Sequence, residues 1–350
     1  MIALVTGSSG FVGSHLVEAL AGAGWEMRRL VRPGGAPRGS PRAAPELPAA
    51  LARRVTTHAA DYATPGADAS AVARDARAAL DGVDAVFHVA GVTRRRTLAE
   101  FRAGNVAPTR TLLDALALVP RPPGRFVLVS SQAAAGPAAS PERPRSEADL
   151  PEPVGAYGHS KREAERLVAA HAGAEAAGIA WTVVRPSAVY GPRDADFLPV
   201  FRSAARGVAL YPGPADGCLS LVYVGDLARA LVLAAATPGA AGRAYFVAGE
   251  EHTSWAGVYA AAAAAAGRRV RFGAAAPAWA LGVAGVVGDA WGAVSGRCPL
   301  VTREKARLAR PRYWCCSAAR ARVELGWRGE VALAEGARRT FAWYRAQGRI

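Results

Sequence analysis

The apolar positions of this chain follow two different periods in its first half. Short apolar runs of strand length recur at 2–5, 26–31, 53–58, 85–91, 126–129 and 181–184. Apolar residues spaced every three or four positions, as in amphipathic helices, occur between them at 14–20, 69–80, 105–118 and 157–172. Strands that alternate with helices in this way predict a parallel sheet covered by helices on both faces.

The second half of the chain is less regular. Proline and glycine interrupt residues 187–219, which we expect to be loop-rich, and residues 33–50 predict a surface loop. The remaining expected elements are two strands and three helices, at 221–224, 245–247, 226–236, 255–266 and 339–347. No internal repeat is visible.

Residues 278–294 form the most apolar long stretch of the sequence. Asp289 and several glycines interrupt it, and it falls short of the roughly 18 consecutive apolar residues that indicate a membrane span. We therefore expect a buried or cleft-lining helix and no integral membrane span. Two roles remain open for this helix, the lining of a pocket for a hydrophobic substrate and ordinary core packing.

The composition is typical of a globular protein, with 51% hydrophobic and 20% charged residues among 350. Because the first predicted strand begins at Ile2, a signal peptide of the usual form is not expected. The cysteines show no metal-ligand spacing and the six histidines are scattered, so no metal is expected. The cysteines are Cys218, Cys298, Cys315 and Cys316. We expect reduced thiols and a cytoplasmic protein.

The formal net charge is +15, from 43 basic and 28 acidic residues. The basic residues are spread along the chain and are not interleaved with aromatic residues, so nucleic-acid binding is not expected. An anionic cofactor accounts for part of the charge and solvated surface for the rest. Nearly all basic residues are arginines, and the two lysines are Lys161 and Lys305. A lysine within a motif therefore stands out.

A glycine-rich segment, Thr6–Gly13, follows the first predicted strand and opens the first predicted helix. Gly7, Gly10 and Gly13 form a G-x-x-G-x-x-G pattern. Glycines permit a tight turn and a close approach of the backbone, and a helix N-terminus offers free N–H groups to phosphates. The segment predicts a dinucleotide pyrophosphate site, although alone it also fits an ordinary strand-to-helix turn.

Tyr157 and Lys161 stand four residues apart in a predicted helix and so share one face. A nearby ammonium favours the phenolate and is expected to lower the pKa of the tyrosine, which suits a general acid or base. Ser131 follows the predicted strand at 126–129, where its hydroxyl can hydrogen-bond an oxygen that gains charge. The alternatives without a catalytic role are that Tyr157 and Lys161 form an ordinary pair on the surface of a helix, and that Ser131 only caps the end of a strand.

Together these segments resemble the extended short-chain dehydrogenases/reductases, the NAD(P)-dependent epimerase/dehydratase superfamily. The resemblance runs nearly end to end, through 6–13, 89–91, 105, 131, 157–161, 185–193 and 222–226. It implies a catalytic triad of Ser131, Tyr157 and Lys161, with Lys161 also holding the nicotinamide ribose. It implies further cofactor contacts from Gly7, Ser9, Gly10, Phe11, Val12, Gly13, Asp61, Tyr62, Val89, Ala90, Gly91, Asn105, Pro186 and Val189.

The choice of cofactor depends on the end of the second predicted strand. Relatives specific for NAD place an acidic residue there, to hold the ribose hydroxyls of adenosine. In this chain the position is Arg32, with Arg28 and Arg29 upstream. A guanidinium suits a 2′-phosphate through charge-assisted hydrogen bonds, so NADP is the expected cofactor and NAD the alternative.

Departures from the family patterns narrow the expected reaction. Gln132 and Ala133 follow Ser131, where sugar 4,6-dehydratases carry an Asp-Glu pair for elimination. Ala188 and Leu219 stand where UDP-sugar epimerases carry an asparagine and an arginine that hold the sugar nucleotide. Residues 185–193 and the tail at 313–344 are instead similar to the branch of dihydroflavonol reductases and 3β-hydroxysteroid dehydrogenases.

We therefore expect an NAD(P)H-dependent oxidoreductase that interconverts a carbonyl and an alcohol on a small-to-medium, largely apolar substrate. The alternative is a nucleotide-sugar epimerase that works by transient oxidation and retains its NAD, and a non-catalytic cofactor sensor is a third hypothesis. A homodimer is the oligomer that the resemblance suggests. Pocket residues are expected, by position alone, at Thr93, Arg94, Gln132, Arg193 and Phe197.

The predicted fold class is α/β, a Rossmann doubly wound parallel sheet with a smaller, discontinuous C-terminal substrate domain. The nucleotide-binding domain is expected to span residues 1–186 and 219–250, where a later pair of strands completes the sheet. The substrate domain is expected to span residues 187–218 and 251–350.

Overall fold

The computed structural model describes residues 1–34, 49–172, 178–275, 277–295 and 302–350. Its central feature is a seven-stranded parallel sheet in the order β10-β6-β5-β4-β1-β2-β3. The strands are β1 (Ile2–Thr6), β2 (Glu26–Val31), β3 (Val55–Ala59), β4 (Ala85–His88), β5 (Arg125–Val129), β6 (Ala180–Pro186) and β10 (Arg243–Val247). The strand order reverses between β1 and β4, which is where an open parallel sheet of this kind binds ligands.

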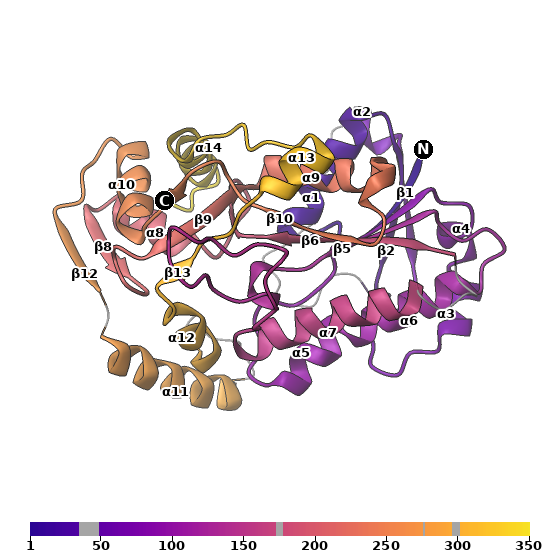
Figure 1. Cartoon of the computed structure of the whole chain (residues 1–350), viewed down its shortest axis with the longest axis horizontal. Helices are drawn as coiled ribbons and strands as arrows, with labels where there is room; N and C mark the ends of the chain where they lie inside the picture. Colours follow the sequence, from indigo (N-terminus) through magenta and orange to yellow (C-terminus); the bar gives the residue numbers. More distant parts are fainter. Residues whose placement is uncertain (35–48, 173–177, 276, 296–301) are drawn as a thin grey trace.

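Alternate residues of each central strand enter two separate cores, because successive side chains of a strand point to opposite faces. In β1, Ala3 and Val5 belong to one core and Leu4 belongs to the other. The first core is covered by α1 (Phe11–Gly22), α9 (Val224–Ala236) and α13 (Ala319–Leu325). The second is covered by α3 (Ala69–Asp75), α4 (Arg77–Leu80), α6 (Ala107–Ala117) and α7 (Gly155–Ala172) (Figure 1). The predicted doubly wound α/β fold is confirmed.

Two of the expected helices are divided in the structure. The stretch 69–80 forms α3 and α4 with a break at Ala76. Asn105 ends a separate helix, α5 (Leu98–Asn105), and does not begin the next one. Thr97 sets the start of α5, because its side chain accepts a hydrogen bond from the backbone N–H of Glu100 at 3.2 Å. Most of the expected loop at 33–50 lies outside the described residues, and α2 (Ala49–Ala52) follows it.

A second group of elements lies beside the carboxyl end of the large sheet, toward the left of Figure 1. β9 (Cys218–Tyr223) pairs there with β7 (Ala188–Tyr190), β11 (His252–Thr253) and β13 (Tyr313–Trp314). The prediction that a later pair of strands completes the large sheet is therefore wrong for β9, and only β10 joins it. The physical reason is that β7 continues from β6 just past Ser187 and takes β9 as its partner.

The stretch expected to be loop-rich, at 187–219, also contains regular structure. It holds β7, α8 (Leu198–Ala204) and β8 (Val208–Tyr211), and β8 pairs with β12 (Phe272–Ala275). Three helices, α8, α10 (Trp255–Ala265) and α14 (Leu333–Ala346), pack around a third core that includes Phe201 and Tyr344. Two short 3₁₀ turns, η1 (Gln132–Ala134) and η2 (Pro238–Ala240), complete the described elements.

The most apolar stretch forms α11 (Ala278–Ser295), which packs chiefly against α12 (Arg303–Ala309) at the lower left of Figure 1. The expectation of a buried helix is wrong, since Trp279 and Trp291 are 74% and 64% exposed. The contact with α12 uses the opposite face, where a Cβ on Gly285 would lie 2.9 Å from the backbone nitrogen of Arg303. Within the described residues, no helix is both long and apolar enough to cross a bilayer.

We expect Phe126→Ala to lower the free energy of unfolding by about 3–5 kcal/mol, because Phe126 is fully buried in the core beneath α6 and α7. Urea denaturation followed by circular dichroism measures the change. Val323→Ala is the matched control on a residue that is 84% exposed, and its effect should stay within about 0.5 kcal/mol. Similar losses for both variants would contradict this assignment of the core.

Candidate active site

The glycine-rich loop between β1 and α1 presents backbone N–H groups at the carboxyl end of the sheet. Gly10 is the N-cap of α1 and no side chain caps this helix, whose first helical bond runs from Ser14 N to Gly10 O at 2.9 Å. Gly7 has a φ of +69°, and a Cβ on Gly13 would lie 2.1 Å from Gly7 O. The N–H groups of residues 11–13 and this side-chain-free cradle fit a dinucleotide pyrophosphate.

The loop after β4 packs directly on the glycine-rich loop. A Cβ on Gly7 would lie 2.6 Å from Ala90 N, and Ala90 N donates a hydrogen bond to Thr6 Oγ1 at 3.3 Å. The buried ring of His88 forms hydrogen bonds with two hydroxyl groups. Its Nδ1 lies 2.8 Å from Thr6 Oγ1, and its Nε2 lies 3.0 Å from Thr109 Oγ1. Burial, aided by the charge of Lys161, lowers the pKa of His88 to about 3, so this ring stays neutral. The segment 89–91 is therefore held against the glycine-rich loop.

Ser131, Tyr157 and Lys161, the triad that the resemblance implies, all lie at this end of the sheet, Ser131 after β5 and the other two on α7. Ser131 follows β5, its Oγ accepts a hydrogen bond from Ala133 N at 3.2 Å, and its hydroxyl is close enough to the Tyr157 phenol to influence the pKa of that group. Lys161 lies one turn further along α7 and donates from Nζ to Val129 O at 2.9 Å. A Cβ on Gly91 would lie 3.3 Å from Lys161 Nζ, so this ammonium borders the loop after β4.

The electrostatics of the Tyr157 phenol differ from the expectation. Burial raises the pKa of Tyr157 to about 12, the nearby Ser131 hydroxyl opposes this rise, and the charge of Asp196 adds to it. The prediction that Lys161 lowers the pKa of Tyr157 is therefore wrong for this arrangement. The Lys161 ammonium instead donates a hydrogen bond to the backbone oxygen of Val129. Burial also lowers the pKa of Lys161 from 10.5 to about 8, against the pull of Glu165. The phenol is a protonated acid at neutral pH.

Asn105, expected to touch the cofactor, has a side chain that is taken up by protein groups. Its Oδ1 accepts a hydrogen bond from Val92 N at 2.7 Å, and its Nδ2 donates to Val92 O at 3.1 Å. Nδ2 also donates to Ser160 Oγ at 2.9 Å. Asn105 therefore ties the loop after β4 to α7, next to Lys161, and it positions both.

A buried ion pair behind α7 escaped the sequence reasoning. Arg185 on β6 donates from Nε and a terminal nitrogen to the two oxygens of Glu165, at 2.8 Å and 2.7 Å. Ser130 Oγ donates to the same carboxylate at 2.6 Å, and Arg162 donates at 2.9 Å. Glu165 stands four residues after Lys161, so the spacing of α7 was the available signal. The pair fixes α7 to β5 and β6.

A second missed residue, Glu304 on α12, holds the start of α7. Its Oε1 accepts a hydrogen bond from the backbone N–H of Tyr157 at 2.8 Å, and the residue is buried. A carboxylate at a helix N-terminus satisfies a free N–H group and interacts favourably with the helix dipole. Gly155, with a φ of +67°, leaves room for it, since a Cβ there would lie 2.2 Å from Oε1.

The expected adenosine end of the cofactor site is built from β2 and the segment after β3. Tyr62 is buried beside Thr6, and burial raises its pKa to about 12 while the charge of Arg32 opposes this. Arg32 is exposed, and Asp61 is exposed and accepts a hydrogen bond from Thr64 N at 3.1 Å. Arg29 was not singled out by its spacing, yet its Nε donates to Ser8 Oγ in the glycine-rich loop at 2.9 Å.

Two further expected cofactor residues lie beyond β5. Pro186 is buried at the end of β6, and Val189 is half-buried in β7 against the first core. Their neighbour Ser187 has a buried Oγ without a hydrogen-bond partner among the described residues. These positions continue the carboxyl edge of the sheet past Ser131.

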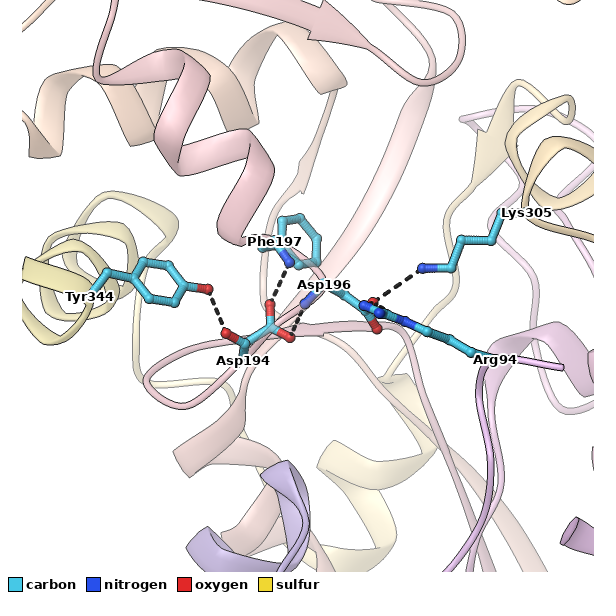
Figure 2. A network of polar contacts seen from close by, with 6 residues as sticks. All are labelled: Arg94, Asp194, Asp196, Phe197, Lys305 and Tyr344. Carbon is cyan, nitrogen blue, oxygen red and sulfur yellow. Dashed lines mark hydrogen bonds and ion pairs between the residues drawn. The ribbon is translucent and has the colours of Figure 1, made fainter. Parts of the chain in front are cut away.

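Arg94, one of the expected pocket residues, takes part in a polar network that borders Tyr157. Figure 2 shows Arg94 and Lys305 both pointing at the carboxylate of Asp196, with Arg94 Nε at 3.0 Å and Lys305 Nζ at 3.1 Å. These cations hold the pKa of Asp196 below its usual value, against burial. The network thus joins the loop after β4, the loop after β7 and α12.

The neighbouring Asp194 organises the loop after β7. It accepts hydrogen bonds from Asp196 N at 2.9 Å and Phe197 N at 2.8 Å, and its carbonyl accepts one from the hydroxyl of Tyr344 at 2.9 Å (Figure 2). Burial raises the pKa of Asp194 to about 6 in spite of these bonds. Asp194 therefore anchors the loop that carries Asp196 to α14.

The other expected pocket residues are placed differently from one another. Gln132 is buried directly after Ser131, and its Nε2 lacks a hydrogen-bond partner among the described residues. Thr93 is exposed. The structure does not bring Arg193 or Phe197 to the Tyr157 group: Arg193 donates to Glu18 on α1 at 2.7 Å, and the ring of Phe197 packs in the third core.

Three cysteines, Cys218, Cys315 and Cys316, are free thiols, and Cys298 lies outside the described residues. Within the described part of the chain, no cluster of three or more His, Cys, Asp or Glu residues could hold a metal ion.

Comparison with known proteins agrees with this architecture. The NAD dependent epimerase/dehydratase family matches residues 3–248. A ceramide reductase from Caulobacter vibrioides is 30% identical over 348 residues, which cover 99% of this chain and 95% of that protein. The 4-hydroxy-2-methyl-3-oxo-4-farnesyl-3,4-dihydroquinoline-1-oxide ketoreductase of Stigmatella aurantiaca is 30% identical over 257 residues, which cover 71% of this chain and 68% of that protein.

The fold is also that of solved structures. MoeE5 in complex with UDP-glucose and NAD superimposes with a TM-score of 0.74 over 99% of each chain, at 24% identity. This chain belongs to the NAD-dependent epimerase/dehydratase family, whose members are NAD-dependent oxidoreductases and epimerases, and it is an enzyme of the extended short-chain dehydrogenase/reductase type.

We expect the buried Lys161 ammonium to make stability depend on pH. Its pKa is lowered on folding, so the unfolded chain binds more protons between about pH 8 and pH 10, and the free energy of unfolding rises through this window. Above pH 10 the raised pKa of Tyr157 acts in the opposite direction. Chemical denaturation across the window should show Lys161→Met more stable than wild type at pH 8, with the difference shrinking as the pH rises. A constant difference would contradict the burial of a charged Lys161.

Proposed function

We propose that this enzyme is an NADP(H)-dependent oxidoreductase that interconverts a carbonyl and an alcohol on an apolar substrate. The observation that carries the proposal is the convergence of Ser131, Tyr157 and Lys161 beside the glycine-rich loop. The Ser131 hydroxyl is close enough to the Tyr157 phenol to influence its pKa, and Lys161 Nζ borders Gly91. An acid, an oxygen-binding hydroxyl and a fixed cation are the groups that carbonyl reduction requires from a protein.

When bound, the nicotinamide cofactor supplies the hydride for reduction and accepts it for oxidation. The Tyr157 phenol, protonated at neutral pH, donates its proton to the substrate oxygen as that oxygen gains negative charge. Ser131 donates a hydrogen bond to the same oxygen, and Lys161 would hold the nicotinamide ribose and stabilise the phenolate left on Tyr157. For alcohol oxidation the same proton moves in the reverse direction.

The proposal of an apolar substrate rests on two positions where UDP-sugar epimerases carry polar side chains that hold the sugar nucleotide and this chain carries apolar ones. Ala188 is an exposed residue of β7, and Leu219 is buried in the third core, so neither supplies a polar contact to a sugar nucleotide. Gln132 Nε2 is an unpartnered buried donor next to Ser131, available to a second substrate oxygen. Two relatives are named for reduction of a ceramide and of a farnesyl-bearing quinoline oxide, which supports an apolar carbonyl compound here.

The cofactor proposal rests on two arginines near the adenosine end. Arg32 is exposed at the end of β2, within electrostatic reach of Tyr62, and Arg29 is fixed by Ser8 at the start of the glycine-rich loop. Guanidinium groups at this position favour a 2′-phosphate over the two hydroxyls of NAD.

Turnover by a Tyr157→Phe variant tests the catalytic assignment. We expect NADPH oxidation with a panel of long-chain and ring ketones to fall roughly 10²–10⁴-fold, because the proton donor is lost while the ring and its packing remain. NADPH binding, measured by calorimetry, should be unchanged. Turnover equal to wild type would remove Tyr157 from the mechanism. Wild-type protein that binds NADPH and reduces no ketone of the panel would instead support a cofactor sensor.

Replacing Arg32 tests the choice of cofactor. We expect Arg32→Ala to weaken NADPH binding by about 10- to 100-fold and to leave NADH binding unchanged, since a charge-assisted hydrogen bond to the 2′-phosphate is lost. Arg28→Ala is the matched control, because Arg28 on the same strand donates to Asp81 O at 2.7 Å, away from this site. Purified protein that already carries NAD(H) and is indifferent to Arg32 would favour the epimerase.

A further inference from the structure

The α11–α12 pair carries a concentrated exposed apolar face. Among the described residues, five of the eleven exposed large apolar side chains lie on α11: Trp279, Val283, Val286, Val287 and Trp291. Their spacing of three and four residues places them on one side of the helix. Val283 and Val287 are 56% and 62% exposed, so the described part of the chain leaves this side largely open. The other six are spread over several elements, with two of them, Leu210 and Phe272, on the paired strands β8 and β12.

Basic side chains border the same face. Val283 and Val287 line a groove of about 520 Å³ together with Arg303, Arg307 and Arg310 of α12. Arg303 is paired with Asp289 at 3.7 Å, whereas Arg307 and Arg310 have no carboxylate at ion-pair distance among the described residues. The face thus presents apolar side chains, two indole rings and unpaired guanidinium groups in one place.

We propose that this face docks on the surface of an anionic lipid bilayer. Helices that lie in a membrane interface bury an apolar side and present basic residues to the headgroups. Tryptophan is enriched at the level of the headgroups, and each basic residue near an anionic leaflet adds to the attraction. The net charge of +15 favours the same surface, and the charge complementarity of Arg307 and Arg310 selects a lipid surface over an apolar protein partner.

The opposite side of α12 reaches the active site. Glu304 accepts the Tyr157 N–H bond, and the neighbouring Lys305 donates to Asp196, while Arg303 and Arg307 line the exposed groove. Docking through α11 and α12 therefore places the Tyr157 end of α7 close to the bilayer, where an apolar substrate is concentrated. This consequence rests on the proposed function, whereas the docking itself does not.

Co-sedimentation with vesicles tests the docking, and it uses the full chain without substrate or cofactor. We expect binding to phosphatidylcholine vesicles that contain about 30 mol% phosphatidylglycerol, weaker binding to phosphatidylcholine alone, and a decline with added salt. Two double variants should each weaken vesicle binding by about tenfold or more. One combines Val283→Ser with Val287→Ser, and the other combines Arg307→Gln with Arg310→Gln. Leu150→Ser with Val323→Ser is the matched control, because both side chains are 84% exposed elsewhere, and it should bind as wild type.

All of these substitutions are at exposed positions, and circular dichroism verifies that the variants fold. Absence of binding to either vesicle, or binding that the α11 and α12 variants leave intact, would overturn the proposal. A dimer in analytical ultracentrifugation that dissociates with Val283→Ser and Val287→Ser, without vesicle binding, would overturn it in favour of a second copy of this chain. Because no substrate is present, these outcomes are independent of whether the enzyme reduces a ketone.

Discussion

The burial of the Lys161 ammonium is the constraint on which the arrangement of the site depends. An amine removed from water keeps its proton only if other groups replace the lost solvation, and here Val129 O and the charge of Glu165 do so. Glu165 is itself buried and needs Arg185 and Ser130 as partners. The chain of contacts runs through β5, β6 and α7, so the helix that carries Tyr157 is fixed in place by charge as well as by packing.

The C-terminal part of the chain completes the site from the other side. Glu304 holds the start of α7, and Lys305 joins Arg94 on Asp196, whose charge contributes to the high pKa of Tyr157. These contacts link residues more than a hundred positions apart. The C-terminal elements are thus attached to α7 through polar groups that surround the phenol, and a change in α12 is expected to reach Tyr157 without altering the large sheet.

Local patterns in the sequence were sufficient for the parts of the molecule that obey a short-range rule. The strand-to-helix glycine spacing, the alternation of strands and helices and the four-residue spacing of Tyr157 and Lys161 each follow from backbone geometry. The direction of the Tyr157 pKa shift was wrong, because it depends on burial and on the orientation of Lys161, which spacing does not reveal. The Glu165–Arg185 pair and Glu304 were missed for a related reason, since each contact joins two different elements, whose packing local spacing does not reveal.

The errors in the smaller half of the molecule have the same origin. β9 has the apolar pattern of a buried strand, and that pattern does not state which sheet the strand joins. The apolar sequence of α11 predicts that the helix is buried against another surface. It does not state whether that surface belongs to the protein core. The sequence shows one apolar side of this helix, with Trp279, Val283, Val287 and Trp291. Only the packing of Gly285 against α12 shows that this side faces outward.

Transfer of isotope from the cofactor tests the central claim most directly. Wild-type protein would be given NADPH deuterated at the transferred position of C4 together with an apolar ketone, and the alcohol product analysed by mass spectrometry. The account predicts one deuterium on the carbinol carbon, one NADPH consumed for each alcohol formed, and almost no product from Tyr157→Phe. Product formation without deuterium, or equal labelling by Tyr157→Phe, would contradict it.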